Sequence, residues 1–251
     1  MHFKYGMKSL SLILPIALAW SFLDAPAKPP QSAAESSPLD TVLKKMDTAA
    51  AGFRSTQAEF EWDVYEKVIN EVDDIQKGTI YYRRTGKEIE MMADVKQAGD
   101  DPNKLKPEPK FVLFSKGKVL MYQPKMDQVT QYDAGKNRAD LETYMVLGFG
   151  GSGQDLVRTF DVTYVGPETI NGIATAKLKL IPKSEKVRNT YKEIDLWIDL
   201  DKGISVQQQA FQPNGNYRLA KYSNIRINEK INDDVFKLKT TSKTQTVSPN
   251  G

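Results

Sequence analysis

The residue types that carry most enzyme chemistry are almost missing from this sequence. Its 251 residues include no cysteine, and the only histidine is His2. His2 lies in an N-terminal segment that we expect to be removed. The mature chain would then lack Ser–His–Asp and Cys–His nucleophile systems, histidine general bases and the usual zinc ligands.

Carboxylate chemistry is the remaining catalytic option, because acidic residues occur in adjacent pairs. These pairs are Asp73-Asp74, Asp100-Asp101 and Asp233-Asp234. Each pair lies in a polar, turn-like stretch, where solvated acids are the ordinary case. The sequence therefore argues against an enzyme, and it indicates no cofactor and no metal site.

A glycine pattern offers a second chemical reading. Gly148-x-Gly150-x-x-Gly153 formally matches the dinucleotide-binding fingerprint. That fingerprint needs a strand before it, a long helix after it and a parallel strand beyond. Here a hairpin-like stretch, FDVTYVGPETINGIATAKLKL, follows at once. The segment 139–158 is better interpreted as a flap: a short helix or loop, a glycine hinge and another helical turn.

The stretch KGTIYYRRTGKEIEMMADV, residues 77–95, places two arginines side by side in a strand-like alternation. Neighbouring residues of a strand point to opposite faces, so Arg84 shares a face with Ile80 and Tyr82 while Arg83 does not. A guanidinium in a dry core is costly unless it is paired or hydrogen-bonded. Arg84 therefore either holds backbone carbonyls at a cavity mouth or extends from the strand end into water, and alternation alone does not separate the two.

The surrounding elements predict a mainly β protein. An amphipathic helix comes first, with apolar residues spaced by three and four: Leu39, Val42, Leu43, Met46, Ala50 and Phe53. Period-two alternation then begins in AEFEWDV and recurs in segments as far as NYRLAKYS. Turn signals such as Asn171-Gly172 and Asn214-Gly215 separate many of these segments. The pattern predicts an antiparallel meander of roughly ten strands, which would curl toward a barrel.

Such a curved sheet has an apolar inside, and the sequence allows two interpretations of it. Aromatic and methionine residues are frequent in the strands, among them Phe60, Trp62, Tyr82 and Met91. They could form a packed core, or they could line a cavity for an apolar ligand. Both arrangements need the same periodicity, so the alternative stays open here.

The N-terminus indicates export. Residues 1–27 combine Lys4 and Lys8, the apolar run LSLILPIALAWSFL and an Ala25-Pro26-Ala27 site, as in a secretory signal peptide. The run is shorter than the ~20 residues of a spanning helix. Residues 28–38 predict a flexible linker, and residues 241–251 a disordered tail. Removal of 1–27 lowers the formal charge of +3 by one, and this balance argues against nucleic acid as a partner.

Several motifs in order resemble the periplasmic outer-membrane lipoprotein carriers, the LolA-like family. FRSTQAEFEW is similar to the family's opening strand, and GTIYYRR (78–84) to its motif ending in arginine. SKGKVLMYQPKMDQV (115–129) resembles its Tyr-x-Pro hairpin, and DDVFKL its closing segment. The similarity spans about residues 39–240, which we interpret as a LolA-like lipid-binding domain.

The resemblance implies a strongly curved antiparallel sheet, an incomplete β-barrel closed by the N-terminal helix and a helical lid. It implies a soluble, monomeric periplasmic chaperone that shields the acyl chains of lipoproteins. Its partners would be an inner-membrane ABC transporter and an outer-membrane lipoprotein receptor. Arg84 would latch the lid, which includes YMVLG (144–148). The expected lipid-binding residues are Met46, Phe60, Trp62, Ile80, Tyr82, Met91, Tyr144, Met145 and Leu147.

The chain departs from the family pattern in three places. Thr85 stands where the family usually has a proline after the arginine, and both the insertion 96–110 and the glycine-rich flap are longer than expected. Proteins that sense or carry other lipids share this architecture. The alternative function is therefore a lipid or lipoprotein sensor, or an envelope-maintenance binding protein.

Overall fold

The fold is built on one open sheet of twelve strands. The structure is a computed structural model that describes residues 36–86, 88–133 and 147–248. The leader 1–27 and most of the linker 28–38 lie outside the described residues. Within the described part, no helix is long and apolar enough to cross a membrane.

The strands follow one another along the chain with few interruptions. The helices are α1 (Pro38–Gly52), α3 (Gly153–Thr159) and α4 (Glu185–Arg188), with 3-10 turns η1 (Pro124–Met126) and η3 (Asp233–Phe236). The strands are β1 (Ser55–Glu66), β2 (Glu71–Thr85), β3 (Glu88–Gly99), β4 (Lys106–Ser115), β5 (Lys118–Gln123), β6 (Gln128–Asp133), β7 (Phe160–Ile170), β8 (Ile173–Pro182), β9 (Glu193–Asp199), β10 (Ser205–Phe211), β11 (Tyr217–Ile227) and β12 (Gln245–Val247).

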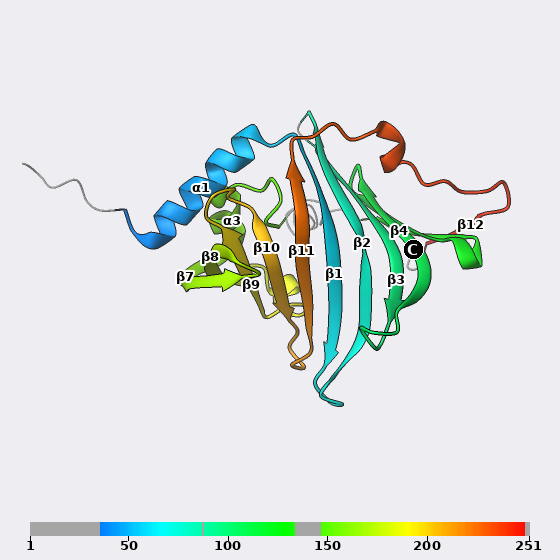
Figure 1. The fold of residues 1–251 in the computed structure, drawn as a ribbon, viewed down its shortest axis with the longest axis horizontal. Coiled ribbons are helices and arrows are strands. Elements are labelled where there is room, and N and C mark those ends of the chain that lie inside the picture. Colours follow the sequence, from blue (N-terminus) through cyan, green and yellow to red (C-terminus); the bar gives the residue numbers. More distant parts are fainter. Residues whose placement is uncertain (1–35, 87, 134–146, 249–251) are drawn as a thin grey trace, which may run out of the picture. The chain divides into compact units, whose positions relative to one another are not determined.

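The strand order is β12-β6-β5-β4-β3-β2-β1-β11-β10-β9-β8-β7, so β7 and β12 form the two edges of the described sheet. Most neighbouring strands are consecutive and pair through hairpins, whereas β1 pairs with β11 from a distant part of the chain. Figure 1 shows β1 and β11 at the centre, with the two halves bending away on either side. The mainly β architecture that the sequence predicts is confirmed, as a sheet that remains open.

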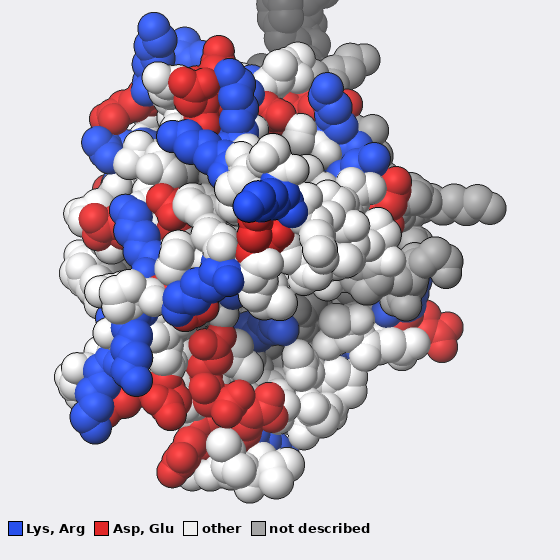
Figure 2. All heavy atoms as spheres, turned by 90° about the vertical axis from the view of Figure 1, so that its right-hand side faces the viewer, with Lys and Arg blue, Asp and Glu red and all other residues white. Residues whose placement is uncertain are grey.

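Two-residue alternation gives the sheet an apolar face and a charged face. On β1, Phe60 and Trp62 point to what we call the inner face, and their rings stack 4.1 Å apart. Glu61 points to the outer face, where it pairs with Lys77 and Lys221, each at 2.7 Å. On the side drawn in Figure 2, residues of both charges are interspersed, and acidic atoms gather toward its lower edge.

Tight turns fix the register of the hairpins. Asn171 and Gly172 join β7 to β8 with φ of 49° and 81°, as a type I′ turn requires. Lys116 and Gly117 do the same between β4 and β5, with φ of 53° and 73°. The turn signals in the sequence therefore mark real hairpins.

Helix α1 covers only one part of the inner face. Ser37 caps the helix by accepting a hydrogen bond from the Asp40 backbone N–H at 3.1 Å, and Pro38 follows at the first helical position. Val42 and Met46 pack on Leu178 and Leu196 of β8 and β9 in one core cluster. A second cluster surrounds Phe53, just beyond the end of α1, over β1 to β4 and β11.

The C-terminal segment covers part of the outer face. Phe236 is buried with Met92 and Leu113. Arg83 lies over the Phe236 ring, 4.1 Å from its centroid, and pairs with Glu90 at 2.7 Å. This segment then leads to β12, which pairs parallel with β6. The structure thus differs from the expected all-antiparallel sheet, and it places a strand within the tail 241–251.

Asn228 joins the end of α1 to the central strands. Its side chain donates to the Gly52 carbonyl at 2.9 Å and accepts from the backbone N–H of Arg54 at 2.7 Å. Its own N–H donates to the Ser55 carbonyl at 2.7 Å. One residue after β11 therefore holds the junction at which α1 gives way to β1.

We expect Asn228→Ala to lower the free energy of unfolding by about 2 kcal/mol, because three backbone groups, the Gly52 carbonyl and the N–H groups of Arg54 and Ser55, lose a partner. Asn224→Ala is the matched control. Asn224 also has a positive φ, of 49°, but its side chain donates only to Glu59 among the described residues. Denaturant unfolding measures both, and equal losses would contradict the role assigned to Asn228.

Candidate functional site

A cavity of about 660 Å³ lies on the inner face, next to the part that the helix covers. Its size is within the ~300–1,000 Å³ of ligand pockets. Most of its wall is apolar. The apolar and aromatic lining residues are Trp62, Val64, Met91, Val112, Val119, Met121, Leu147, Val187, Tyr191, Ile194, Ala210, Leu219, Ala220 and Tyr222.

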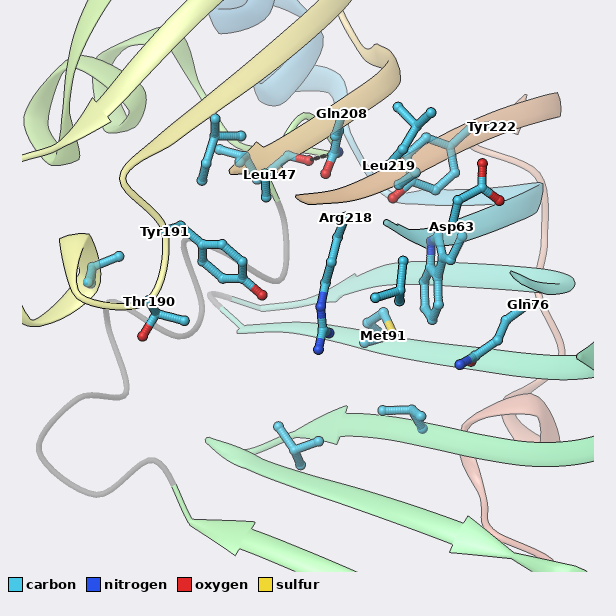
Figure 3. Close-up of a pocket in the computed structure, with 18 of the residues that line it drawn as sticks. Asp63, Gln76, Met91, Leu147, Thr190, Tyr191, Gln208, Arg218, Leu219 and Tyr222 are labelled. Atoms are coloured by element: carbon cyan, nitrogen blue, oxygen red, sulfur yellow. Dashed lines mark hydrogen bonds between the residues drawn. The ribbon is translucent and has the colours of Figure 1, made fainter. Parts of the chain in front are cut away.

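Few polar side chains interrupt this wall. Figure 3 shows Arg218 and Tyr191 extending toward the hollow from opposite sides, with Met91 beyond Arg218. Lys110, Lys186, Thr190, Gln76 and Asp63 also line the cavity. Within the described residues no cluster of histidine, cysteine or carboxylate groups could hold a metal ion. The arrangement suits binding of an apolar molecule.

The segment Leu147–Gly150 closes one end of the cavity. Phe149 is fully buried, stacked on Tyr82 at 4.9 Å and edge-on to Tyr222 at 4.7 Å. Burial raises the pKa of both tyrosines well above the ordinary value, so their phenols stay neutral. Leu147 lies at the boundary between this packed aromatic cluster and the open cavity.

Three hydrogen bonds between described residues hold the backbone of this segment to the sheet. Gln208 donates to the Leu147 carbonyl at 2.5 Å, and Ser205 donates its N–H to the Gly148 carbonyl at 2.9 Å. Arg84 donates from Nη2 to the Gly150 carbonyl at 2.9 Å. The Arg84 guanidinium also lies 5.8 Å from the centroid of the Phe53 ring. Arg84 is also exposed at the end of β2. Its geometry therefore agrees with both interpretations that the sequence left open, a guanidinium that holds a carbonyl and one that extends into water.

The glycine pattern of this segment has a packing explanation. Gly148 and Gly150 both have φ of +78°. A Cβ on Gly150 would come within 2.6 Å of the Phe53 ring, and one on Gly148 within 2.3 Å of the Ser205 Cβ. Gly153 is similarly close to the backbone of Leu43. The spacing that resembles a dinucleotide fingerprint thus serves close backbone contact, and α3 after it has only seven residues.

The expected lipid-binding residues fall into three groups. Trp62, Met91 and Leu147 line the cavity, although Met91 and Leu147 are only 2% and 6% exposed and also belong to the packed clusters. Met46, Phe60, Ile80 and Tyr82 are at most 4% exposed and belong to the packed clusters behind the cavity wall. Tyr144 and Met145 lie outside the described residues. The prediction that all these residues contact a ligand stays a prediction.

Comparison with known proteins places this fold in a family. The sequence model of the family described as "Outer membrane lipoprotein carrier protein LolA" matches residues 103–239, more than half of the chain. The chain belongs to this family. No curated protein sequence matches the LolA-family chain.

Solved structures resemble this LolA-family chain at low sequence identity. An uncharacterized conserved protein from Thermus thermophilus has 10% identity and a TM-score of 0.51, over 83% of this chain and 97% of that one. Pseudomonas aeruginosa MucB, in complex with MucA, has 14% identity and a TM-score of 0.44, over 78% and 59%. A putative outer membrane lipoprotein-sorting protein domain from Vibrio parahaemolyticus has 11% identity and 0.42, over 79% and 95%.

Sequence reasoning missed the polar residues of the cavity in this LolA-family protein. Arg218 lies on the same strand face as Ala220 and Tyr222, and Lys110 on the same face as Val112 and Phe114. Alternation could therefore have placed both on the inner face. Gln208 could not have been singled out, because QQQ at 207–209 gives no sign of which glutamine faces inward.

We expect Gly150→Ala to destabilise this LolA-family protein by at least about 3 kcal/mol, through backbone strain and the clash with Phe53. Gly172→Ala is the control, since its φ is +81° and no atom lies within 4 Å of an added Cβ. It should cost roughly 1 kcal/mol. Thermal and denaturant unfolding measure both; similar values would contradict the close approach of this segment.

Proposed function

We propose that this LolA-family protein is a periplasmic carrier that holds the acyl chains of lipoproteins in the cavity beside Leu147. In this role it takes lipoproteins from an inner-membrane ABC transporter and delivers them to an outer-membrane receptor. The observation that supports it most is the cavity of about 660 Å³ with a mainly apolar wall on the inner face. The family membership supports the choice of cargo.

The physical reason for such a carrier is the cost of acyl chains in water. Each buried methylene contributes about 0.8 kcal/mol, so one long chain could contribute on the order of 10 kcal/mol before the costs of binding. The wall residues Met91, Val112 and Ile194 would contact the chain directly. A carrier that binds this tightly also needs a means of release.

The segment Leu147–Gly150 provides a candidate for release. Its three hydrogen bonds to the sheet stabilise the closed arrangement, in which Phe149 fills the end of the hollow. If an acyl chain enters by displacing this segment, binding of the chain competes with the hydrogen bonds that hold the segment on the sheet. Arg84 would then favour the empty form and so promote release.

The cavity is tested by filling it. Ala220 lines the cavity on β11, and its register partners on the adjacent strands, Trp62 and Gln208, line it too. We expect Ala220→Trp to weaken binding of a neutral apolar fluorophore, 1-N-phenylnaphthylamine, by about tenfold or more, which is ~1.4 kcal/mol. Ala51→Trp on the exposed side of α1 is the control and should bind normally. Fluorescence titration measures both, with displacement by a purified lipoprotein. No binding by the native protein would refute the carrier proposal.

The proposed role of Arg84, which is to hold the segment Leu147–Gly150 closed, is tested with the two adjacent arginines. We expect Arg84→Leu to bind cargo about tenfold more tightly and to release it more slowly, because the closed empty form loses a charge-assisted hydrogen bond of ~1.5–3 kcal/mol. Arg83→Leu loses its contacts with Glu90 and Phe236 on the outer face and should leave cargo affinity unchanged. The readout is transfer of a labelled lipoprotein to acceptor vesicles. Normal transfer by Arg84→Leu would contradict the role of Arg84 in cargo release.

A further inference from the structure

The cavity wall contains basic side chains that have no partner in the described part of the chain. Lys110 on β4, Arg218 on β11 and Lys186 on α4 all line it. Among the described residues, none of the three makes a side-chain hydrogen bond or an ion pair within 4.0 Å. Lys110 is half-buried, and Arg218 extends into the hollow in Figure 3.

Several basic residues on the outer face of the same sheet are neutralised. On the outer face, Lys221 pairs with Glu61 at 2.7 Å and Asp63 at 2.8 Å. Lys177 and Lys179 pair with Asp195 and Glu193 at 3.0 and 3.1 Å. This comparison suggests that the cations of the cavity wall bind a negatively charged partner that is not part of the chain.

The acidic groups near the cavity are already engaged. Asp63 is the one acidic residue among the described lining residues, and its carboxylate is held on the outer face by Lys221 at 2.8 Å. Asp74 accepts a hydrogen bond from Gln76, and Glu108 pairs with Lys125. Asp74 and Glu108 lie near enough to Lys110 to favour its charged form, but neither is within ion-pair distance of it. The described wall therefore keeps an excess of positive charge.

Lys110 and Arg218 line the same cavity although they stand on different strands, β4 and β11. Their strands are four positions apart in the sheet, which would be ~19 Å if the sheet were flat. Yet burial first, and then the charge of Arg218, lower the pKa of Lys110. Because the sheet bends, both residues line the same cavity. Lys110 is half-buried and Arg218 is exposed. A positive charge near a half-buried ammonium is unfavourable, and an anion bound by both side chains offsets that repulsion.

We propose that the cavity binds amphiphiles with one anionic group, a carboxylate or a phosphate, which Lys110 and Arg218 hold while the apolar chain lies along Met91 and Val112. This inference rests on the proposed function, because it assumes that an acyl chain occupies the cavity. It goes further by assigning a headgroup site.

The test compares ligands that share a chain and differ in charge. Laurate, dodecyl phosphate and methyl laurate each displace 1-N-phenylnaphthylamine from the full-length protein. We expect laurate and dodecyl phosphate to act at concentrations about tenfold lower than methyl laurate. Inorganic phosphate should weaken laurate binding without affecting methyl laurate. That result would show that the site recognises the anionic group of the ligand rather than its chain.

The decisive variant is Lys110→Gln with Arg218→Gln. It should bind methyl laurate as the native protein does, while its preference for laurate falls to about twofold or less. Lys44→Gln with Lys179→Gln is the control, because it removes two positive charges from outside the cavity wall and should keep the preference. Melting temperatures establish that both double variants fold.

Each result separates the two proposals. Equal affinity for laurate and methyl laurate in the native protein would overturn the headgroup site and leave the acyl-chain cavity intact. A preference that survives Lys110→Gln with Arg218→Gln, or that disappears in the control, would also overturn it. Failure of every amphiphile to displace the fluorophore would overturn the proposed function itself.

Discussion

The structure depends on how an open sheet covers its apolar face. A sheet of twelve strands that alternates apolar and charged residues has one side that must be kept from water. Helix α1 and the segment Leu147–Gly150 cover one part of that side and pack it completely, as the full burial of Phe149 shows. Beside this packed part a cavity remains, lined among others by Val64 and Met121. One face of the sheet thus carries both a packed core and a cavity.

The sequence predicts the sheet well because alternation and turn chemistry act locally. Phe60, Trp62 and the Asn171-Gly172 turn point to the arrangement that is observed. It does not predict which inner-face residues are covered. Tyr82 and Met91 are register partners on adjacent strands, yet Tyr82 packs on Phe149 while Met91 lines the cavity. That difference depends on where a distant segment lies, which local periodicity does not contain.

The two adjacent arginines show how one local pattern yields two distant contacts. Arg83 points outward and fixes the C-terminal segment through Phe236. Arg84 points inward and holds the Gly150 carbonyl. Each side chain thus connects β2 to a segment that is distant in the sequence. A strand end suits this role, because the charged head can leave the apolar interior while the aliphatic stem stays in it.

Retention and specificity in this cavity have different physical origins. Apolar burial holds any chain of suitable length and scarcely distinguishes one headgroup from another. The cations of Lys110 and Arg218 do the opposite: they add little to a neutral ligand but favour an anion. Partial burial weakens the hydration of Lys110, whereas Arg218 is exposed and contributes its charge at the cavity wall. A LolA-family wall made only of apolar residues would be a general acyl-chain binder. The two cations make this chain selective at the level of charge, and their cost to the empty protein is offset only when an anionic ligand occupies the hollow.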